Sequence, residues 1–352
     1  MFDNEFDPNT ITPDNGNYFG ISIDAEKAAL VLISAPWDAT SSIRSGSSYA
    51  PDAIIDASRF VDFYEPLAPN TWRKGIATAP IDYSIQDLSH RLHPDTERIV
   101  KLHDELGMSV IDNLMYERRL RRVNEGSVEV NDNVFKQTLS WLDKGKIVGL
   151  VGGNQAVTYG AVRAVGYKHE KFGLLHVAPR CCMHEAYQGF DFSHASTMFN
   201  IMRDIPQVEH LVSVGIQDIS PIEWERVTSD QRVKIFTAQE MWNRQFEGDT
   251  WAKIVDDIIS TLPNDVYVSL DIDALEGECS PNKRLLTAGG IGFHQMVYML
   301  ERIVVSGRRI VGFDITEAAP SIDNKAKMRV VARLLFKMCS IALKGVDSPM
   351  IM

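Results

Sequence analysis

Short apolar runs alternate with longer amphipathic segments along most of the chain. Near-continuous apolar runs rich in β-branched residues indicate strands of a sheet that is buried on both faces. They fall at residues 29–36, 146–152, 173–177, 211–216, 233–236, 266–272 and 310–315. Helical patterns separate them, for instance at residues 51–60, 133–144, 156–169, 250–261 and 293–305. The repeated order of strand, helix and strand predicts an α/β fold with three layers, α/β/α, around a mainly parallel central sheet.

Two segments stand outside this alternation. Residues 1–26 are polar and rich in turn-forming residues, so we expect an N-terminal arm that docks loosely. Residues 86–131 are polar and helical in character and contain no strand-like run, which predicts a helical insertion at the rim. Residues 27–352 are otherwise predicted to form a single domain, since single α/β domains often reach this size.

Composition narrows the classes of partner. The chain has 352 residues and a formal net charge of −11, which argues against nucleic acid or an anionic membrane as partner. A small cationic ligand is compatible with this charge, although solubility is the better explanation. We expect a cytoplasmic protein, because the chain has neither a membrane-length apolar run nor the features of a signal peptide. The cysteines show no metal-binding spacing and are interpreted as thiols; they are Cys181, Cys182, Cys279 and Cys339.

Chemically informative residues follow four of the predicted strands. They occupy positions 152–155 (Gly-Gly-Asn-Gln), 178–182 (Ala-Pro-Arg-Cys-Cys), 271–275 (Asp-Ile-Asp-Ala-Leu) and 314–317 (Asp-Ile-Thr-Glu). In open parallel sheets, ligands bind beyond the carboxyl ends of the strands. The sequence therefore predicts that these four segments meet at one mouth.

The order and spacing of these segments along the chain resemble those of the arginase, agmatinase and formimidoylglutamase (ureohydrolase) superfamily. The markers are residues 152–156, 193–196, 269–273 and 312–317, and the resemblance covers roughly residues 29–344. It implies an arginase-like fold and hydrolysis of C–N bonds in linear amidines. It also implies two Mn²⁺ or Ni²⁺ ions held by two His and four Asp, with a bridging water as nucleophile.

Four of the six positions that match the superfamily's metal ligands carry other residues. The matching positions are Gln155, Ala178, Arg180, Cys182, Asp271 and Asp273, and the last two alone keep the family's residue. Ala178 offers no donor, Gln155 offers a neutral oxygen, and the fixed charge of Arg180 repels a divalent cation. We therefore expect no metal cofactor and a degenerate member, acting as a non-catalytic structural, regulatory or ligand-binding subunit.

Further departures surround the expected site. Residues 41–47 stand where the superfamily has a Gly-rich substrate loop, and residues 274–277 and 286–290 also differ from its pattern. Because supporting residues tune a metal site as well as its ligands, the change extends beyond a single inactivating substitution.

Two candidate catalytic residues remain by resemblance. Glu317 matches the acidic residue that grips the substrate's guanidinium, and His194 matches the proton-shuttling histidine. The structural alternatives are a paired buried carboxylate for Glu317 and a hydrogen-bonded rim histidine for His194. We also hypothesise that Arg180 replaces the cations by bridging Asp271 and Asp273; a solvated surface arginine is the alternative.

A rival hypothesis keeps enzymatic activity. The chain would be a hydrolase or transferase acting on a guanidino compound, agmatinase- or guanidinase-like, through a thiol or a single metal ion. Cys181, Cys182 and His184 place thiols near an imidazole, which favours a lowered thiol pKa and nucleophilic attack. Cys182, His184 and Asp273 could instead hold one Zn²⁺, and inert packing thiols are the third alternative.

The resemblance also bears on assembly. Superfamily members commonly form trimers or hexamers, so it implies a homo-oligomer. A hetero-oligomer with an active paralogue, in which this chain is structural or regulatory, stays open.

Overall fold

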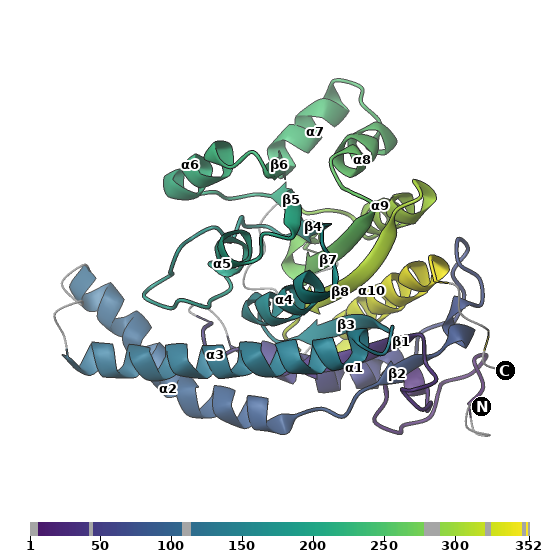
Figure 1. The fold of residues 1–352 in the computed structure, drawn as a ribbon, viewed down its shortest axis with the longest axis horizontal. Coiled ribbons are helices and arrows are strands. Elements are labelled where there is room, and N and C mark those ends of the chain that lie inside the picture. The colour runs from purple at the N-terminus through teal and green to yellow at the C-terminus, as the bar shows by residue number, and fades with distance from the viewer. Residues whose placement is uncertain are drawn as a thin grey trace.

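A computed structural model of the chain, which describes residues 6–41, 45–107, 114–277, 289–320, 325–346 and 350, contains an eight-stranded parallel sheet (Figure 1). The strands are β1 Leu30–Ala35, β2 Ile76–Thr78, β3 Ile147–Gly152, β4 Phe172–Val177, β5 Val208–Ile216, β6 Val233–Thr237, β7 Asp265–Asp271 and β8 Arg309–Thr316. Their order is β2-β1-β3-β8-β7-β4-β5-β6, and each neighbouring pair is parallel. All seven predicted strands are present. The prediction missed β2, whose three residues are too few to give a pattern.

Helices cover both faces of the sheet. They are α1 Ala50–Ser58, α2 Tyr83–Leu106, α3 Leu114–Leu142, α4 Thr158–Lys168, α5 Thr197–Asp204, α6 Pro221–Ser229, α7 Ala238–Phe246, α8 Trp251–Ser260, α9 Phe293–Val305 and α10 Lys325–Lys344. Side chains of α1 and α7 to α10 join the hydrophobic core on one face, and those of α2 to α6 join the core on the other. The predicted three-layer α/β/α architecture is therefore confirmed.

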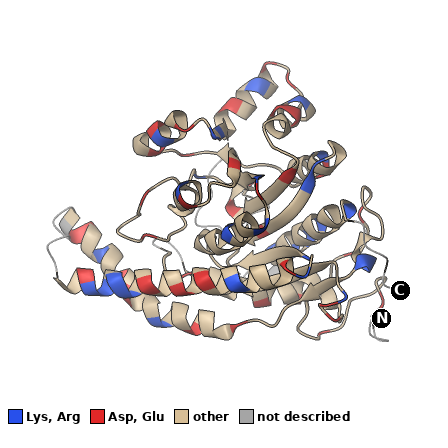
Figure 2. Cartoon of the chain, viewed as in Figure 1, with Lys and Arg blue, Asp and Glu red and all other residues tan. Residues whose placement is uncertain are grey.

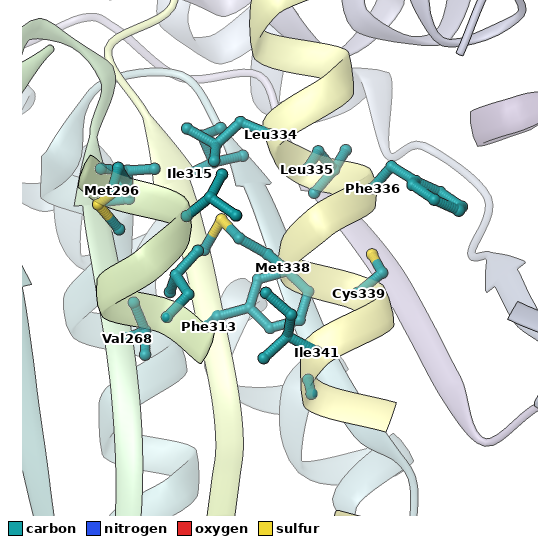
Figure 3. Close-up of a cluster of buried hydrophobic side chains, with 14 of the residues drawn as sticks. Val268, Met296, Phe313, Ile315, Leu334, Leu335, Phe336, Met338, Cys339 and Ile341 are labelled. Atoms are coloured by element: carbon teal, nitrogen blue, oxygen red, sulfur yellow. The ribbon is translucent and has the colours of Figure 1, made fainter. Parts of the chain in front are cut away.

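Helix α10 packs directly on β8 in the first of these cores. Figure 3 shows Leu334 and Met338 of α10 beside Phe313 and Ile315 of β8. Burying each such side chain contributes about 1.5–3 kcal/mol. On the neighbouring strand Gly149 is required, because a Cβ there would lie 2.5 Å from the ring of Phe313.

The N-terminal residues that are described do not dock loosely. Tyr18 and Phe19 are 0% exposed and belong to the core beside α1 and α10. The Tyr18 hydroxyl lies 2.8 Å from Ser34 Oγ, and the backbone N–H of Phe19 donates to Ser58 Oγ at 2.6 Å. The expectation of loose docking is therefore wrong for this part, because two aromatic residues within a polar segment carry no periodic signal.

Residues 86–131 fall within two long helices, apart from Gly107, which follows α2, and the stretch 108–113, which lies outside the described residues. Figure 1 shows α2 and α3 side by side, reaching beyond the sheet at the left. The chain continues in α3 to Leu142, and α3 also packs on α4, with Val130 and Val134 buried in the second core. Within the described residues, no helix combines the length and apolarity that a membrane crossing requires.

Candidate functional site

Four neighbouring strands, β3, β8, β7 and β4, end at the same edge of the sheet, and the informative residues follow them. The Glu317 carboxylate, beyond β8, accepts a hydrogen bond from the backbone N–H of Gln155, beyond β3, at 2.7 Å. The Cys182 thiol, beyond β4, donates to Gln155 Oε1 at 3.0 Å. Asp271, at the end of β7, lies close enough to Cys182 and Glu317 for their charges to interact. The predicted meeting of the four segments is confirmed.

Gln155 is the centre of a buried chain of hydrogen bonds between uncharged groups. Gln155 Oε1 accepts from Cys182, and Gln155 Nε2 lies 2.8 Å from His176 Nε2. On the other side of the imidazole, His176 Nδ1 lies 3.1 Å from Ser213 Oγ. Since an amide nitrogen can donate but not accept, His176 accepts at Nε2, carries its proton on Nδ1 and donates to Ser213. All four side chains belong to residues at most 2% exposed.

Burial keeps this chain neutral. It lowers the pKa of His176 to about 3, and it raises the pKa of the Cys182 thiol well above its usual range, with the charge of Asp271 adding to the rise. Near neutral pH the imidazole is therefore unprotonated and the thiol keeps its proton. We call Cys182, Gln155, His176 and Ser213 the neutral chain below.

The β7 and β8 side of the mouth is acidic. Asp271 and Asp273 are each 7% exposed, and Asp271 Oδ1 accepts from the backbone N–H of Asp273 at 2.8 Å, at the start of the short 3-10 helix Ile272–Ala274. Burial raises the pKa of Asp271 well above its usual range, and the charges of Asp273 and Glu317 raise it further. We call these three carboxyl groups the acidic side of the mouth; their like charges disfavour ionisation of Asp271.

Glu317 is fixed at the junction of the two sides. Its φ of 64° is in the left-handed region, and its backbone N–H donates to the Gly153 carbonyl at 2.8 Å. Together with the hydrogen bond from Gln155, this contact ties the end of β8 to the end of β3.

Arg180 does not bridge the two aspartates. Its side chain is 48% exposed, and its guanidinium lies 3.9 Å from Asp218, a residue just beyond β5. The bridging hypothesis is therefore wrong, and the alternative of a largely solvated arginine describes its position. The reason is local: the backbone of Arg180 forms a β-bridge with that of Asp218, which carries the side chain away from β7.

His194 lies at the rim beside other aromatic and imidazole groups. It is half-buried, and its ring packs edge-on against Tyr187 with centroids 5.9 Å apart. Burial lowers its pKa to about 4, and the charges of Arg180 and His184 lower it further. A neutral imidazole can still accept a proton or a hydrogen bond, so the geometry retains this property of the matching family residue.

The adjacent thiols lack the surroundings of a nucleophile. Burial raises the pKa of Cys181 as well as that of Cys182, with the charge of Glu223 adding to the effect at Cys181. His184 Nε2 lies 3.3 Å from a Glu223 oxygen, so its partner is a carboxylate. Among the described residues, no group of three or more His, Cys, Asp or Glu side chains is arranged to hold a metal ion.

Parts of the loops around the mouth lie outside the described residues. These are residues 42–44 of the segment that matches the substrate loop, and residues 278–288, which include Cys279 and positions 286–288. The flanks of the first loop are held by Asp38, whose carboxylate accepts from the backbone N–H of Gly46 at 2.6 Å and from Ser89 Oγ at 2.9 Å.

Sequence reasoning did not identify several residues that build the mouth. His176 and Ser213 lie within apolar strands, where a lone polar residue signals a buried hydrogen bond. Ser220 and Glu223 form a capping box that starts α6, a pattern readable from their spacing. No pattern in the sequence pointed to Gln217. Both polar atoms of its side-chain amide are buried without a partner among the described residues.

Comparison with known proteins agrees with this architecture. The arginase family model matches residues 28–340. An N(1)-aminopropylagmatine ureohydrolase of Thermus thermophilus is 26% identical over 328 residues, 92% of each chain. An agmatinase of Bacillus anthracis is 24% identical over 307 residues, covering 87% of this chain and 89% of that one. The solved proclavaminate amidino hydrolase of Streptomyces clavuligerus superposes with a TM-score of 0.70 at 18% identity, covering 94% and 97% of the two chains.

The parallel sheet with its mouth at the strand ends defines an arginase-like α/β/α protein. The chain belongs to the arginase family.

Proposed function

We propose that this chain is an arginase-family protein without a dinuclear metal cluster, and that it acts as a non-catalytic, ligand-binding subunit. The observation that carries the proposal is the neutral chain of Cys182, Gln155, His176 and Ser213. It joins the segments that follow β3 and β4, and it includes two of the four matching ligand positions in those segments. Its members satisfy one another, so their donors and acceptors are committed within the protein.

The side chains present do not fit a dinuclear cluster. Two divalent cations need several hard, anionic donors to offset their charge. Gln155 is neutral and engaged at both polar atoms, Ala178 has no donor, and Arg180 is cationic. Cys182 holds its proton, which leaves Asp271 and Asp273 as the two carboxyl donors among the matching positions.

The acidic side supports binding of a small cation instead. Asp271, Asp273 and Glu317 offer carboxyl groups that fit an alkylammonium or guanidinium group, the latter through paired hydrogen bonds. The unpartnered amide of Gln217, beyond β5, adds a donor and an acceptor at the same edge of the sheet. Family relatives named for agmatine and aminopropylagmatine support a guanidino or amino compound as the ligand class.

Metal content is the first test. Protein purified without chelators and dialysed against Mn²⁺ or Ni²⁺ should retain less than about 0.1 equivalent by inductively coupled plasma mass spectrometry, because donors are missing. It should also release no urea from agmatine. Retention of about two equivalents together with turnover would show a working two-metal amidinohydrolase and would overturn the proposal.

Ligand binding is tested separately by calorimetric titration with agmatine. Glu317→Gln should weaken binding by about 10-fold or more, since it removes one charge-assisted contact. Asp218→Asn is the matched control, because it removes a carboxylate that lies beside Arg180 outside the acidic side. Equal losses in both variants, or no saturable binding by the wild-type chain, would count against a specific cation site.

The rival thiol enzyme makes a different prediction. A nucleophilic cysteine would react preferentially with iodoacetamide, and ligand would protect it. With both adjacent thiols buried and protonated, we expect slow labelling that agmatine does not change. Rapid, ligand-protected labelling of Cys182 would favour the thiol enzyme.

Assembly and location complete the proposal. We expect a trimer or hexamer, or a mixed oligomer with an active paralogue, in the cytoplasm. Light scattering of the purified chain measures the mass of the homo-oligomer. Co-purification from cells with a catalytic family member tests the mixed oligomer.

A further inference from the structure

Helix α10 has a charge composition unlike that of the rest of the chain. Its sequence from Lys325 to Lys344 contains six Lys or Arg residues and no Asp or Glu, although the chain as a whole carries −11. Figure 2 shows blue bands and no red on this helix. The apolar face of α10 packs on β8 (Figure 3), and Arg329 and Arg333 are exposed.

Three of these cations line a cavity. Arg329, Arg333 and Lys337 recur at every fourth residue and therefore share one face of the helix. The cavity beside them measures about 510 Å³, and its opposite wall is the segment after α1 that carries the exposed rings of Phe60 and Tyr64. It shares no residue with the mouth described above.

Both guanidinium groups are oriented by aromatic rings. The guanidinium carbon of Arg329 lies 4.3 Å from the ring centroid of Phe60, and that of Arg333 lies 4.9 Å from that of Phe293. Stacking on a ring fixes the plane of a guanidinium and leaves its N–H edge free to donate. A ligand that accepts from these edges would therefore meet pre-oriented donors.

The charges of Arg329 and Arg333 are also uncompensated. Within the described part of the chain, neither forms a salt bridge or hydrogen bond with a protein group. Lys337, in contrast, pairs with the buried carboxylate of Glu65 at 2.5 Å. Asp62 also lines the cavity, but it lies beyond salt-bridge distance of both arginines.

We propose that this cavity binds a small organic anion with a carboxylate or phosphate head and an apolar ring or chain. The guanidinium groups of Arg329 and Arg333, one helical turn apart in α10, can donate to the oxygens of such a head, and the exposed rings of Phe60 and Tyr64 offer a surface for the apolar body. A volume of about 510 Å³ lies within the range of small-molecule pockets. Nothing in the proposed function of the strand-end mouth requires this site.

Calorimetric titration of the full chain with phenyl phosphate tests the proposal. Inorganic phosphate and benzyl alcohol probe the head and the ring separately. We expect saturable binding of phenyl phosphate, weaker binding of inorganic phosphate and none of benzyl alcohol. Arg329→Gln/Arg333→Gln should weaken phenyl phosphate binding at least about 10-fold.

Two controls separate this site from general charge effects. Arg302→Gln/Lys344→Gln removes the same charge outside the cavity and should leave the affinity within about two-fold, since exposed charges are screened. Phe60→Ala should reduce the ratio of the affinity for phenyl phosphate to the affinity for inorganic phosphate. Equal losses in both double variants, or no saturable binding up to about 10 mM, would overturn the proposal. A change of oligomer mass in the Arg329→Gln/Arg333→Gln variant would also overturn it, by showing a second copy of the chain in the cavity.

Discussion

The two sides of the mouth satisfy their polar groups in opposite ways. On the β3 and β4 side, Gln155 and Cys182 are joined to His176 in a chain of neutral hydrogen bonds. After β7 and β8, Asp271 lies close to Asp273 and Glu317, and burial together with these neighbouring charges raises the pKa of Asp271. The polar groups of the first set pair with one another, whereas at Asp271 the neighbouring charges of the second set repel its own.

The residues at the positions that match metal ligands therefore differ in what they contribute. Some offer no polar group to the mouth, and others take part in hydrogen bonds that join the strand ends. Ala178, at a position that matches a metal ligand, has no side-chain group that could bind a metal ion or form a hydrogen bond. Gln155 and Cys182 are different, because they form new contacts that stabilise the strand ends without a metal. The neutral side therefore supports the fold, and the acidic side is the part to which the proposed function assigns ligand binding.

The largest effect is expected when metal donors are placed at the four changed positions that follow β3 and β4. The variant Gln155→His/Ala178→Asp/Arg180→His/Cys182→Asp should raise bound Mn²⁺ from below about 0.1 to about two equivalents, because both sides then supply anionic or imidazole donors. Mass spectrometric metal analysis measures this, and Gln155→His alone is the control that should bind little. A folded quadruple variant that stays metal-free would place the defect beyond the six matching positions.

Asp314, a fully buried residue of β8 whose charge acts on Asp271, makes the stability of the fold sensitive to pH. Burial raises its pKa to about 7 in the fold, although Ser269 donates to it at 2.9 Å. In the unfolded chain this carboxyl ionises near pH 4. Its contribution to stability is therefore fully present below about pH 4 and is lost as the pH rises through 7.

Asp314→Asn should remove this dependence. A shift of this size corresponds to roughly 4 kcal/mol, so the free energy of unfolding should fall less steeply between about pH 4 and 7 in the variant than in the wild type. Urea unfolding at several pH values measures the slope, and the exposed Asp256 provides the control Asp256→Asn. Identical slopes for wild type and Asp314→Asn would mean that the buried carboxyl is already ionised at neutral pH.

A smaller effect tests the neutral chain itself. Gln155→Leu leaves the buried His176 Nε2 without its donor and should lower the free energy of unfolding by about 1–3 kcal/mol. Gln245→Leu is the matched control, since that amide makes one long hydrogen bond to the Met241 carbonyl in α7, away from the mouth. Denaturant titration compares them. Equal stability of the two variants would show that the neutral chain contributes little to the fold.

The smallest effect is expected at Arg180. Its contact with Asp218 is long and exposed, and such pairs contribute about 0–1 kcal/mol. Arg180→Ala should therefore change stability by less than about 0.5 kcal/mol, measured by thermal unfolding. A loss above about 2 kcal/mol would indicate that Arg180 pairs with buried carboxylates in solution after all.

The pattern of apolar and polar positions was sufficient for the central part of the fold. Runs such as 147–152 and 310–315 are apolar on both faces because helices cover both faces of the sheet, and that property is written locally in the sequence. The convergence of the four strand ends followed from the parallel arrangement alone. The three-residue β2 and the buried Tyr18 and Phe19 escaped prediction, because neither is long enough to show a period.

The directions of individual side chains were decided only by tertiary structure. The sequence identifies Arg180 as a cation beside two acids, but the β-bridge to Asp218 turns it toward solvent. The partners of Gln155 come from β4 and the loop after it, and the cavity along α10 needs Phe60 from a distant segment. A sequence fixes which groups are present and where its strands run. Which groups satisfy each other depends on contacts between segments far apart in the chain, and no local pattern records them.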